Sequence, residues 1–530
     1  MNRRVRSCVH PDGYFLFGIH KPSYKVLNHR LNDEIIELGE LDGHVIIKNK
    51  ENFPKGDLTI KSAQHIYEIP NPFPFWGTTY ILGNVADKKA GSDTPIYFSP
   101  AAQSSFDKWD DFKKIDISSI PRPIILTIAQ TCKNPEILRS LLPLCAEFIS
   151  DSKGKIKGLK YIKDKDGNIR PLIKDHDLYE TLGNNPFLDD YLKQIMLLNP
   201  GVQGQSPIVG EYIEKEKCHI WEYLRANSYI PWGHYASNMA QDSIRYSVDE
   251  LSLEDIKGLR HLYYQRIFTQ LAYLLKIDIK KRGLFSEEEL ELLRKELLDH
   301  IFKKRELLFT STLWGWNYGY DFSGSGFRLH ASHQQIHQQF ALIPEEISAK
   351  GSVGMLPSYS VGDLVASFID EYKKEFGSSF FDSLIKAILS NKRTDSRGDL
   401  EESLVIFKDE NIIVYVPKAQ RSQGELQLLC LKKVGNILEA DLETRRSIDK
   451  GILIAVRVLS ALGAKMITCI EVSKRFNSFA NQHLFYSFLP KHPQSPGAFS
   501  EQQGRWITGH FPEDFALSCR KRLLTILNSL

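Results

Sequence analysis

The alternation of apolar and polar residues predicts two similar helix-and-strand units in separate parts of the chain. In the first, apolar residues recur with helical spacing from Ile256 to Leu271, directly after a capping sequence at Ser252–Asp255. A second helix with an aspartate cap is predicted over 441–462. Strands are predicted beside it at 411–417, 426–431, 465–472 and 483–490. The order of elements recurs after about two hundred residues, which indicates an internal duplication.

The first 205 residues have a different pattern. Short apolar segments between turn residues, such as 44–47 and 79–82, predict strands and loops over 1–120. From 121 the pattern changes to helical spacing over 135–150, followed by a hairpin at 158–171. We interpret 121–205 as an accessory insertion.

Candidate chemistry gathers between Asn317 and Pro344, where a glycine-rich sequence runs directly into imidazoles and amides. Glycines allow the backbone to approach a ligand closely. If 333–339 is extended, four polar side chains share one face of the strand: His333, Gln335, His337 and Gln339. As a helix, the segment would instead carry a solvated or metal-binding stripe of His330, His333 and His337. The glycines before it and the apolar run 340–344 after it favour the strand.

The motif around this strand resembles a known family. Gln335–Gln339, with Ser332 before it and Asn317-Tyr318-Gly319 upstream, is similar to the active-site strand of the galactose-1-phosphate uridylyltransferase branch of the histidine triad superfamily. Members of that branch carry Asn-x-Gly and then Ser-x-x-His-x-His-x-Gln. They transfer a nucleoside monophosphate through a covalent nucleotidyl-histidine, and they consist of two fused triad-like halves of which only the first keeps the nucleophile.

The resemblance implies a role for each matching residue. It makes His337 the nucleophile and Gln339 the amide that holds the phosphate. Nucleotide and phosphate contacts are expected from Asn317, Gly319, Ser332 and Gln335. Arg328 is close in sequence and could neutralise the leaving group, and the alternative for it is a salt bridge on the surface. Gln335 departs from the pattern because it stands where the family usually has its first histidine. The partner of the nucleophile at that position is a backbone carbonyl in this family, so activity is compatible with glutamine.

Two further positions are compared with the family. The segment Asn71–Trp76 holds aromatic residues between prolines, and a similar segment lines the nucleotide pocket in this family, so Asn71 and Phe73 are candidate pocket residues. The alternative is a proline-broken edge that packs on the core. Some members hold a metal in the second half, where Glu425 and at most His483 match and the remaining positions look apolar, so we expect no metal and a solvated or capping role for Glu425.

Composition limits the possible partners. The 68 basic and 65 acidic residues nearly cancel, so the overall charge gives no reason to expect nucleic acid or a membrane surface as a partner. Seven scattered cysteines without a Cys-x-x-Cys pair predict free thiols and a cytoplasmic location. No targeting segment is evident, and the most apolar run, 452–464, is too short to span a bilayer. No cofactor is implied.

Together these observations predict an α+β protein of two fused triad-like halves with an N-terminal accessory region. The expected divisions are 1–120, which contributes to the nucleotide pocket, the insertion 121–205, the catalytic half 206–345, a linker with helices 346–404, and the non-catalytic half 405–530. The expected activity moves a nucleoside monophosphate from a nucleotide sugar or a dinucleoside polyphosphate to phosphate or a sugar phosphate. The alternative is a catalytically silent nucleotide-binding or regulatory protein with the same fold.

Overall fold

The structure is a computed structural model of the whole chain. It describes residues 6–21, 23–29, 36–49, 56–61, 64–92, 96–98, 115–167, 169–185, 187–197, 251–279, 285–304, 307–319, 337–351, 354–464, 466–490, 500 and 502–526. The first part of the expected catalytic half, 206–250, therefore lies outside the described residues.

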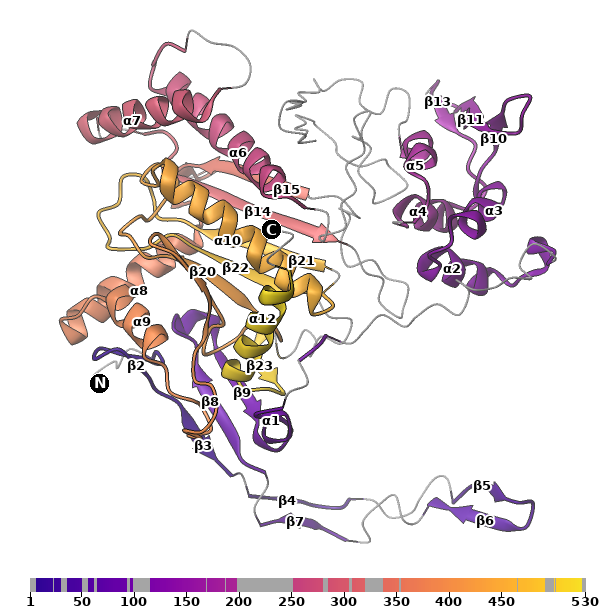
Figure 1. Ribbon diagram of the computed structural model, residues 1–530, viewed down its shortest axis with the longest axis horizontal. Helices are drawn as coiled ribbons and strands as arrows, with labels where there is room; N and C mark the ends of the chain where they lie inside the picture. Colours follow the sequence, from indigo (N-terminus) through magenta and orange to yellow (C-terminus); the bar gives the residue numbers. More distant parts are fainter. Residues whose placement is uncertain are drawn as a thin grey trace.

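A seven-stranded antiparallel sheet forms the centre of the protein (Figure 1). Its order is β15-β14-β21-β22-β20-β19-β18. The strands are β14 (Ser311–Gly319), β15 (His337–Ile343), β18 (Val405–Lys408), β19 (Ile412–Tyr415), β20 (Leu426–Cys430), β21 (Met466–Val472) and β22 (Phe485–Pro490). The pairing of β14 with β21, in which Asn317 lies opposite Thr468, joins strands that the sequence assigns to different halves. The two parts of the chain therefore share one sheet.

Helices cover one face of this sheet. They are α6 (Leu253–Leu274), α7 (Glu287–Lys304), α10 (Leu442–Ala461) and α12 (Pro512–Ile526). The predicted caps are confirmed: Ser252 and Asp255 form a reciprocal capping box on α6, and the Asp441 side chain accepts from the Thr444 amide at the start of α10. Apolar side chains of α6 and α10 meet those of the sheet in the largest hydrophobic core.

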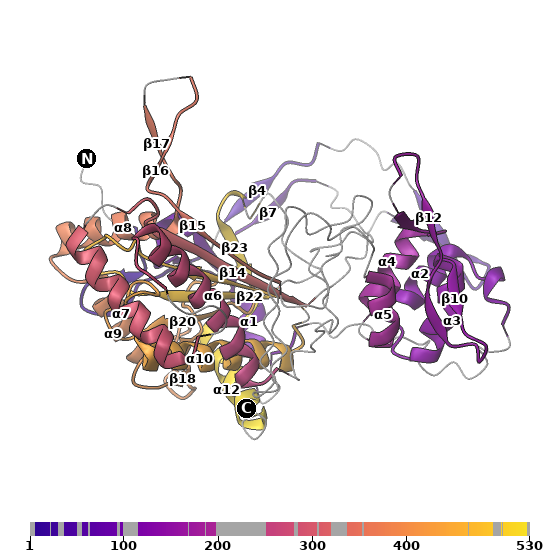
Figure 2. The same ribbon diagram turned by 90° about the horizontal axis from the view of Figure 1, so that it is seen from above.

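The strands on the two sides of the β14–β21 pair are arranged in the same way. Each of these strands has a neighbour that follows it in the chain, β15 beside β14 and β22 beside β21. Each also has a long helix before it in the chain, α10 directly before β21 and α6 before β14 with α7 between them. The helices α6 and α10 lie side by side in both ribbon views (Figures 1 and 2).

The opposite face of the second-half strands is covered by N-terminal residues and by α8 (Val361–Phe376) and α9 (Phe380–Leu389), around a second core. A four-stranded sheet of order β23-β9-β8-β3 belongs to this layer. The remaining elements here are β1 (Val9–His10), β2 (Tyr14–Phe15), β3 (Gly18–His20), β8 (Ile66–Pro70), a 3₁₀ turn (Pro74–Trp76), β9 (Thr78–Leu82), α1 (Gly83–Lys89) and β23 (Arg505–Thr508). Because β9 pairs in parallel with β23, the first and last parts of the chain meet in this layer.

Three hairpins extend away from the body (Figures 1 and 2). They pair β4 (Tyr24–Val26) with β7 (Leu58–Ile60), β5 (Glu37–Leu41) with β6 (Val45–Lys48), and β16 (Glu346–Ser348) with β17 (Met355–Pro357).

A separate small lobe packs around its own apolar core. It contains a 3₁₀ turn (Ile117–Ser119), α2 (Arg122–Thr131), α3 (Pro135–Cys145), α4 (His176–Asn184), α5 (Asp190–Leu197), and the hairpins β10 (Phe148–Ser150) with β11 (Ile156–Leu159) and β12 (Tyr161–Lys163) with β13 (Ile169–Pro171). The hairpin predicted from the sequence of this region is confirmed, and the helix predicted over 135–150 is present over 135–145, with a strand at 148–150 in place of its end.

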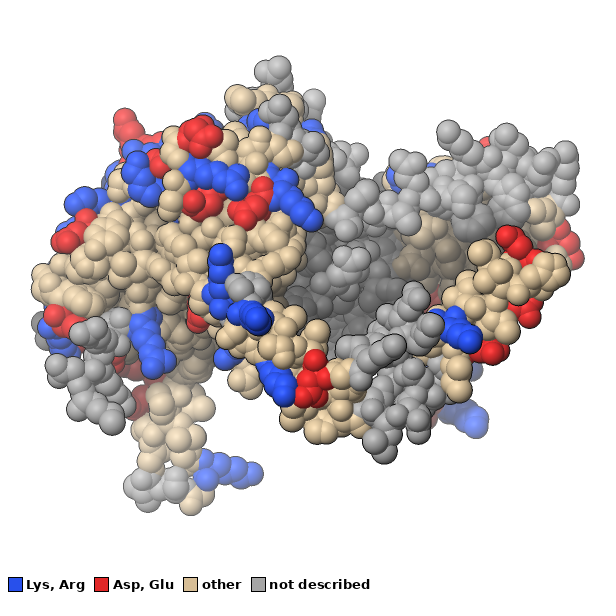
Figure 3. Space-filling view, turned by 90° about the horizontal axis from the view of Figure 1, so that it is seen from below, with Lys and Arg blue, Asp and Glu red and all other residues tan. Residues whose placement is uncertain are grey.

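The charged side chains and the cysteines are arranged as the composition predicts. On the face in Figure 3, acidic and basic side chains of the described residues are interspersed. Six cysteines are buried free thiols, as expected, and Cys218 lies outside the described residues. Among the described helices, none has the length and apolar character needed to cross a bilayer.

Candidate functional site

The predicted nucleophile occupies the first position of β15. His337 pairs with Asn317 of β14, so the segment is extended from this residue onward, and the helical alternative does not hold for 337–343. Residues 320–336, and with them Arg328, Ser332 and Gln335, lie outside the described residues. The side chains of Asn317, His337 and Gln339 lie outside them too, so the structure gives the backbone positions at this part of the site.

The residues next to His337 fix how the strand lies on the sheet. The Gln338 Oε1 accepts a hydrogen bond of 2.8 Å from the Trp314 Nε1, and its Nε2 donates one of 3.2 Å to the Leu259 carbonyl of α6. Two positions later, the Phe340 ring packs against Tyr263 of α6, with ring centroids 5.5 Å apart. Even-numbered positions of β15 thus belong to the helical face. Because strand positions alternate between faces, positions 337 and 339 belong to the other face.

That other face carries exposed apolar side chains beside these positions. Leu313 of β14 is 44% exposed and Ile470 of β21 is 37% exposed, whereas Trp314 and Trp316 on the helical face are buried. Gly315 lies opposite Ile470 on one side and Gln339 on the other. A Cβ at Gly315 would lie 3.1 Å from the Cys469 carbonyl oxygen, closer than almost all real contacts. Because glycine has no side chain, nothing projects from the sheet at this position, and a flat ring could lie against the backbone there.

The sequence analysis did not select these flanking residues. The alternation in Leu313-Trp314-Gly315-Trp316 was the available signal, because two tryptophans at a spacing of two mark the buried face of a strand.

Gln338 offers a test of this geometry. Gln338→Leu removes both hydrogen bonds and leaves the Trp314 N–H unpaired, which should lower the free energy of unfolding by about 1–3 kcal/mol. Looser placement of position 337 should also lower kcat about tenfold or more with little change in KM. Trp314→Phe removes the indole N–H together with part of the buried ring but leaves the Gln338 bond to the Leu259 carbonyl, so it should change kcat in the same direction by less. Unchanged kcat in a destabilised Gln338→Leu variant would show that the contact serves stability alone.

Asn71 and Phe73, the candidate pocket residues, are both buried, with exposed fractions of 1% and 3%. The Phe73 ring stacks on Phe485 of β22 with centroids 5.4 Å apart and planes 3° from parallel. The Asn71 side chain accepts from the Phe73 amide at 3.1 Å and donates to the Ala419 carbonyl at 3.2 Å. The side chains of Asn71 and Phe73 therefore both make their contacts inside the protein. This geometry agrees with the alternative of a proline-rich edge packed on the core.

The same layer encloses a charged cluster of the second half. Arg421 lies over the Trp76 ring, 3.8 Å from its centroid, and its Nη2 donates to Glu425 Oε1 at 2.7 Å and to Ser487 Oγ at 2.6 Å. Glu425 also accepts from the Gln427 side chain. Glu425 is 0% exposed, so the expectation of a solvated residue is wrong, while its Oε2 accepts from the Arg421 backbone amide at 2.6 Å and so caps this turn. Nothing in the sequence indicated this burial. Arg421, which neutralises Glu425, is close in sequence, but the Trp76 ring that lies over Arg421 belongs to a distant part of the chain.

His483 is likewise part of the packing. Its Nδ1 lies 2.8 Å from the Cys430 carbonyl oxygen, and its ring stacks on Phe381. Burial lowers the pKa of His483, so the ring is neutral near pH 7. No set of three or more His, Cys, Asp or Glu residues in the described part of the chain is arranged to hold a metal ion.

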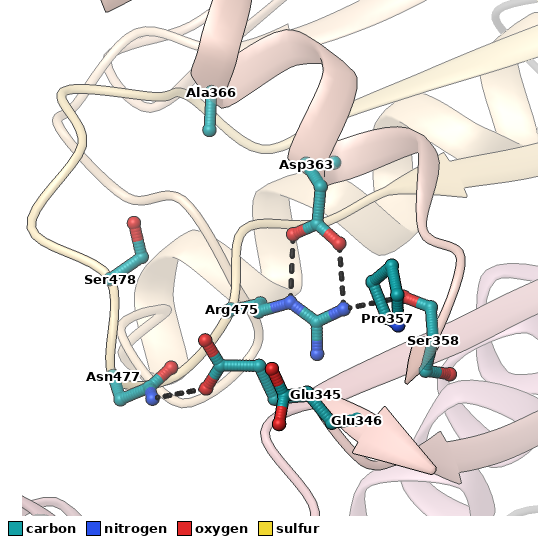
Figure 4. Close-up of a pocket in the computed structure, with 10 residues that line it drawn as sticks. Glu345, Glu346, Pro357, Ser358, Asp363, Ala366, Arg475, Asn477 and Ser478 are labelled. Carbon is teal, nitrogen blue, oxygen red and sulfur yellow. Dashed lines mark hydrogen bonds and ion pairs between the residues drawn. The ribbon is translucent and has the colours of Figure 1, made fainter. Parts of the chain in front are cut away.

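A cavity of about 400 Å³ opens beyond the far end of β15 (Figure 4). Arg475 at its centre forms a paired contact with Asp363 at 2.8 and 2.6 Å and donates to Thr310 and to the carbonyls of Pro344 and Ser358. All its N–H groups therefore have acceptors within the protein, and it acts as a clamp on the end of the strand. About six residues of extended chain, roughly 20 Å, separate this cavity from position 337, so it does not belong to the same site.

Comparisons with known proteins found similar solved structures but no matching sequence. Neither a family model nor a curated protein sequence matches the chain. Similar solved structures include a GalT-like protein from Arabidopsis thaliana, at 12% identity over 52% of this chain and 71% of that chain, with a TM-score of 0.34. An ADP-glucose phosphorylase from the same plant, solved with bound ADP-glucose, is 13% identical over 53% and 70%, with a TM-score of 0.35.

A uridylyltransferase structure is 14% identical over 46% of this chain and 69% of that chain, with a TM-score of 0.32. With TM-scores of 0.32 to 0.35, these similarities assign no activity to the chain. The function has to be argued from its own residues.

Proposed function

We propose that this protein is a nucleotidyltransferase that carries a nucleoside monophosphate on His337. The donor is a nucleotide sugar or a dinucleoside polyphosphate, and the acceptor is phosphate or a sugar phosphate. The observation that carries the proposal is the position of residue 337, which alternation along β15 assigns to the sheet face with the exposed side chains of Leu313 and Ile470.

The chemistry follows from the residue types. A histidine with an ordinary pKa is largely neutral at pH 7, so one ring nitrogen of His337 can attack the α-phosphorus of the donor without a separate base. A P–N bond forms as the P–O bond to the leaving phosphate group breaks. In the second half-reaction an acceptor phosphate oxygen attacks phosphorus, and the P–N bond breaks to free the imidazole. The Gln339 amide and the Ser332 hydroxyl would donate to the phosphoryl oxygens as negative charge develops on them.

The face beside position 337 supports the binding of a nucleotide. Leu313 and Ile470 offer apolar surface for a base, and Gly315 between them allows a flat ring to approach the backbone. Arg328 would meet the leaving group.

We further propose that the chain consists of two related halves and that only the first is catalytic. The balanced order β15-β14-β21-β22 and the adjacent helices α6 and α10 support this division. In the second half, the face that corresponds to the proposed site is filled by the stacked rings of Phe73 and Phe485 and by Arg421 with its partners. No ligand can occupy that space while these contacts persist.

Gln335 favours a second candidate, a silent nucleotide-binding protein, because the family usually has histidine there. Incubation with labelled UDP-glucose, ADP-glucose and diadenosine tetraphosphate separates the two. The transferase should form an adduct of one nucleoside monophosphate that is labile in acid and stable in alkali, and the adduct should disappear on addition of phosphate or a sugar phosphate. Tight nucleotide binding without any adduct would identify the silent protein.

A further inference from the structure

A second cavity, of about 550 Å³, lies on the helical side of the sheet where α6, α7 and α10 meet (Figure 1). The helices line it with residues one turn apart, such as Lys257 and His261 on α6 and Arg445 and Asp449 on α10. Cavities that bind small molecules usually have volumes of about 300 to 1,000 Å³, so there is room for a ligand. The sheet separates this cavity from the face proposed for catalysis.

In each of two groups that line this cavity, one buried polar atom has no hydrogen bond from the described residues. Asp449 is 4% exposed, and its Oδ1 accepts no hydrogen bond from any described residue. The Arg260 Nε lies 3.8 Å from that oxygen, and its guanidinium is already bonded to Glu471. His261 Nε2 also has no partner among the described residues. Buried polar atoms are normally hydrogen-bonded, so these two indicate a partner supplied by a ligand.

The charges around the cavity determine which ligand fits. Arg445 is committed to Glu291 at 3.0 Å and to the Ala440 carbonyl, and Lys257 pairs with Glu254 at 2.7 Å. Carboxylates of the first turn of α7, Glu287 and Glu288, add negative charge at the edge of the cavity. Four carboxylates and two basic side chains line the cavity; Glu287 is also paired with Arg446 outside the lining, and the Asp449 Oδ1 lies inside without a hydrogen bond from any described residue.

We propose that this cavity binds a small organic cation with N–H donors, such as an alkyl diamine, through Asp449 and His261. One ammonium group donates to the Asp449 carboxylate and to the neutral His261 ring, while the other lies near the carboxylates of α7. The N–H donors satisfy the two unpartnered acceptors, and the positive charge offsets the excess of carboxylates.

Binding should depend on pH. Burial raises the pKa of Asp449 to about 7 and lowers the pKa of His261. The groups that face Asp449 are Arg260, Lys257, His261 and Tyr264 of α6, Glu287 of α7, and Arg445 of its own helix. Below pH 7 the carboxyl becomes neutral, so the diamine should bind on the order of tenfold more weakly at pH 5.5 than at pH 8.

Titration calorimetry of the full chain with 1,4-diaminobutane tests the proposal, with 1,4-butanediol as an uncharged match and inorganic phosphate as an anionic probe. The diamine should bind and the other two should not. Equal binding of the diol, binding of phosphate in place of the diamine, or no diamine binding up to about 10 mM would overturn the proposal.

Variants locate the binding. Asp449→Asn, which keeps the size of the side chain, should weaken diamine binding about tenfold or more and abolish its pH dependence. His261→Leu should also weaken diamine binding. This second variant keeps the proposal testable if Asp449→Asn fails to fold. Glu443→Gln removes a carboxylate from an exposed position of the same helix outside the cavity and should leave binding unchanged. Loss of affinity in Glu443→Gln equal to that in Asp449→Asn would contradict the assignment.

Discussion

Replacing His337 with alanine should lower the rate of nucleotidyl transfer at least about ten-thousand-fold, because the proposed covalent intermediate forms on this imidazole. The strand should remain in place, since Gln338 and Phe340 anchor it to α6 from the opposite face. Nucleotide affinity should therefore change much less than kcat. Single-turnover kinetics with each donor, together with intact-protein mass measurement of the adduct, would measure both effects.

A matched control is His300→Ala on α7. This ring lies on the protein surface, 3.3 Å from the Glu296 carbonyl, and is carried on a helix that packs outside the sheet. Its replacement should leave the rate unchanged. An adduct that persists in His337→Ala would assign the nucleophile to another residue and remove the mechanism proposed here. Loss of nucleotide binding together with the rate would instead indicate damage to the whole face.

The sequence predicted the second half of the chain well because its signals are local. Asp441 caps α10, and the strands β19, β20, β21 and β22 were expected within a few residues of their observed bounds. Capping residues, helical spacing and short β-branched runs act through neighbours in the chain, so they can be read without knowledge of the fold. The strand character of 337–343 belongs to the same class of signal.

Long-range contacts were not predictable in this way. Asn71 and Phe73 match a nucleotide-pocket motif, yet their partners are Ala419 and Phe485, more than three hundred residues away. Glu425 pairs with Arg421 only four residues away, but Trp76 of the N-terminal layer lies over that arginine, and this distant contact could not be read from the sequence. A motif gives residue types at a spacing, and only the fold decides whether those residues face a cleft or the core.

Breaking the buried ion pair between Arg260 and Glu471 should strongly lower the stability of the protein. Arg260 on α6 is 1% exposed, and its Nη2 donates to Glu471 of β21 at 3.2 Å and to the Tyr486 hydroxyl at 2.6 Å. Its guanidinium also lies 4.3 Å from the centre of the Trp314 ring. Arg260→Met leaves the Glu471 carboxylate buried without a cation, so it should lower the free energy of unfolding by about 3–5 kcal/mol.

The test is a double-mutant cycle followed by the fluorescence of the tryptophans, two of which, Trp314 and Trp316, lie in the core beside the pair. Arg260→Met and Glu471→Gln should each destabilise the sheet, whereas the double variant should lose less than the sum, because no unpaired charge remains buried. Additive losses would mean that the two side chains act independently. Since Arg260 contacts Trp314 and Trp314 bonds to Gln338, the single Arg260→Met variant should also lower kcat, as Gln338→Leu does. A destabilised Arg260→Met variant with wild-type kcat would show that the pair supports the fold without positioning His337.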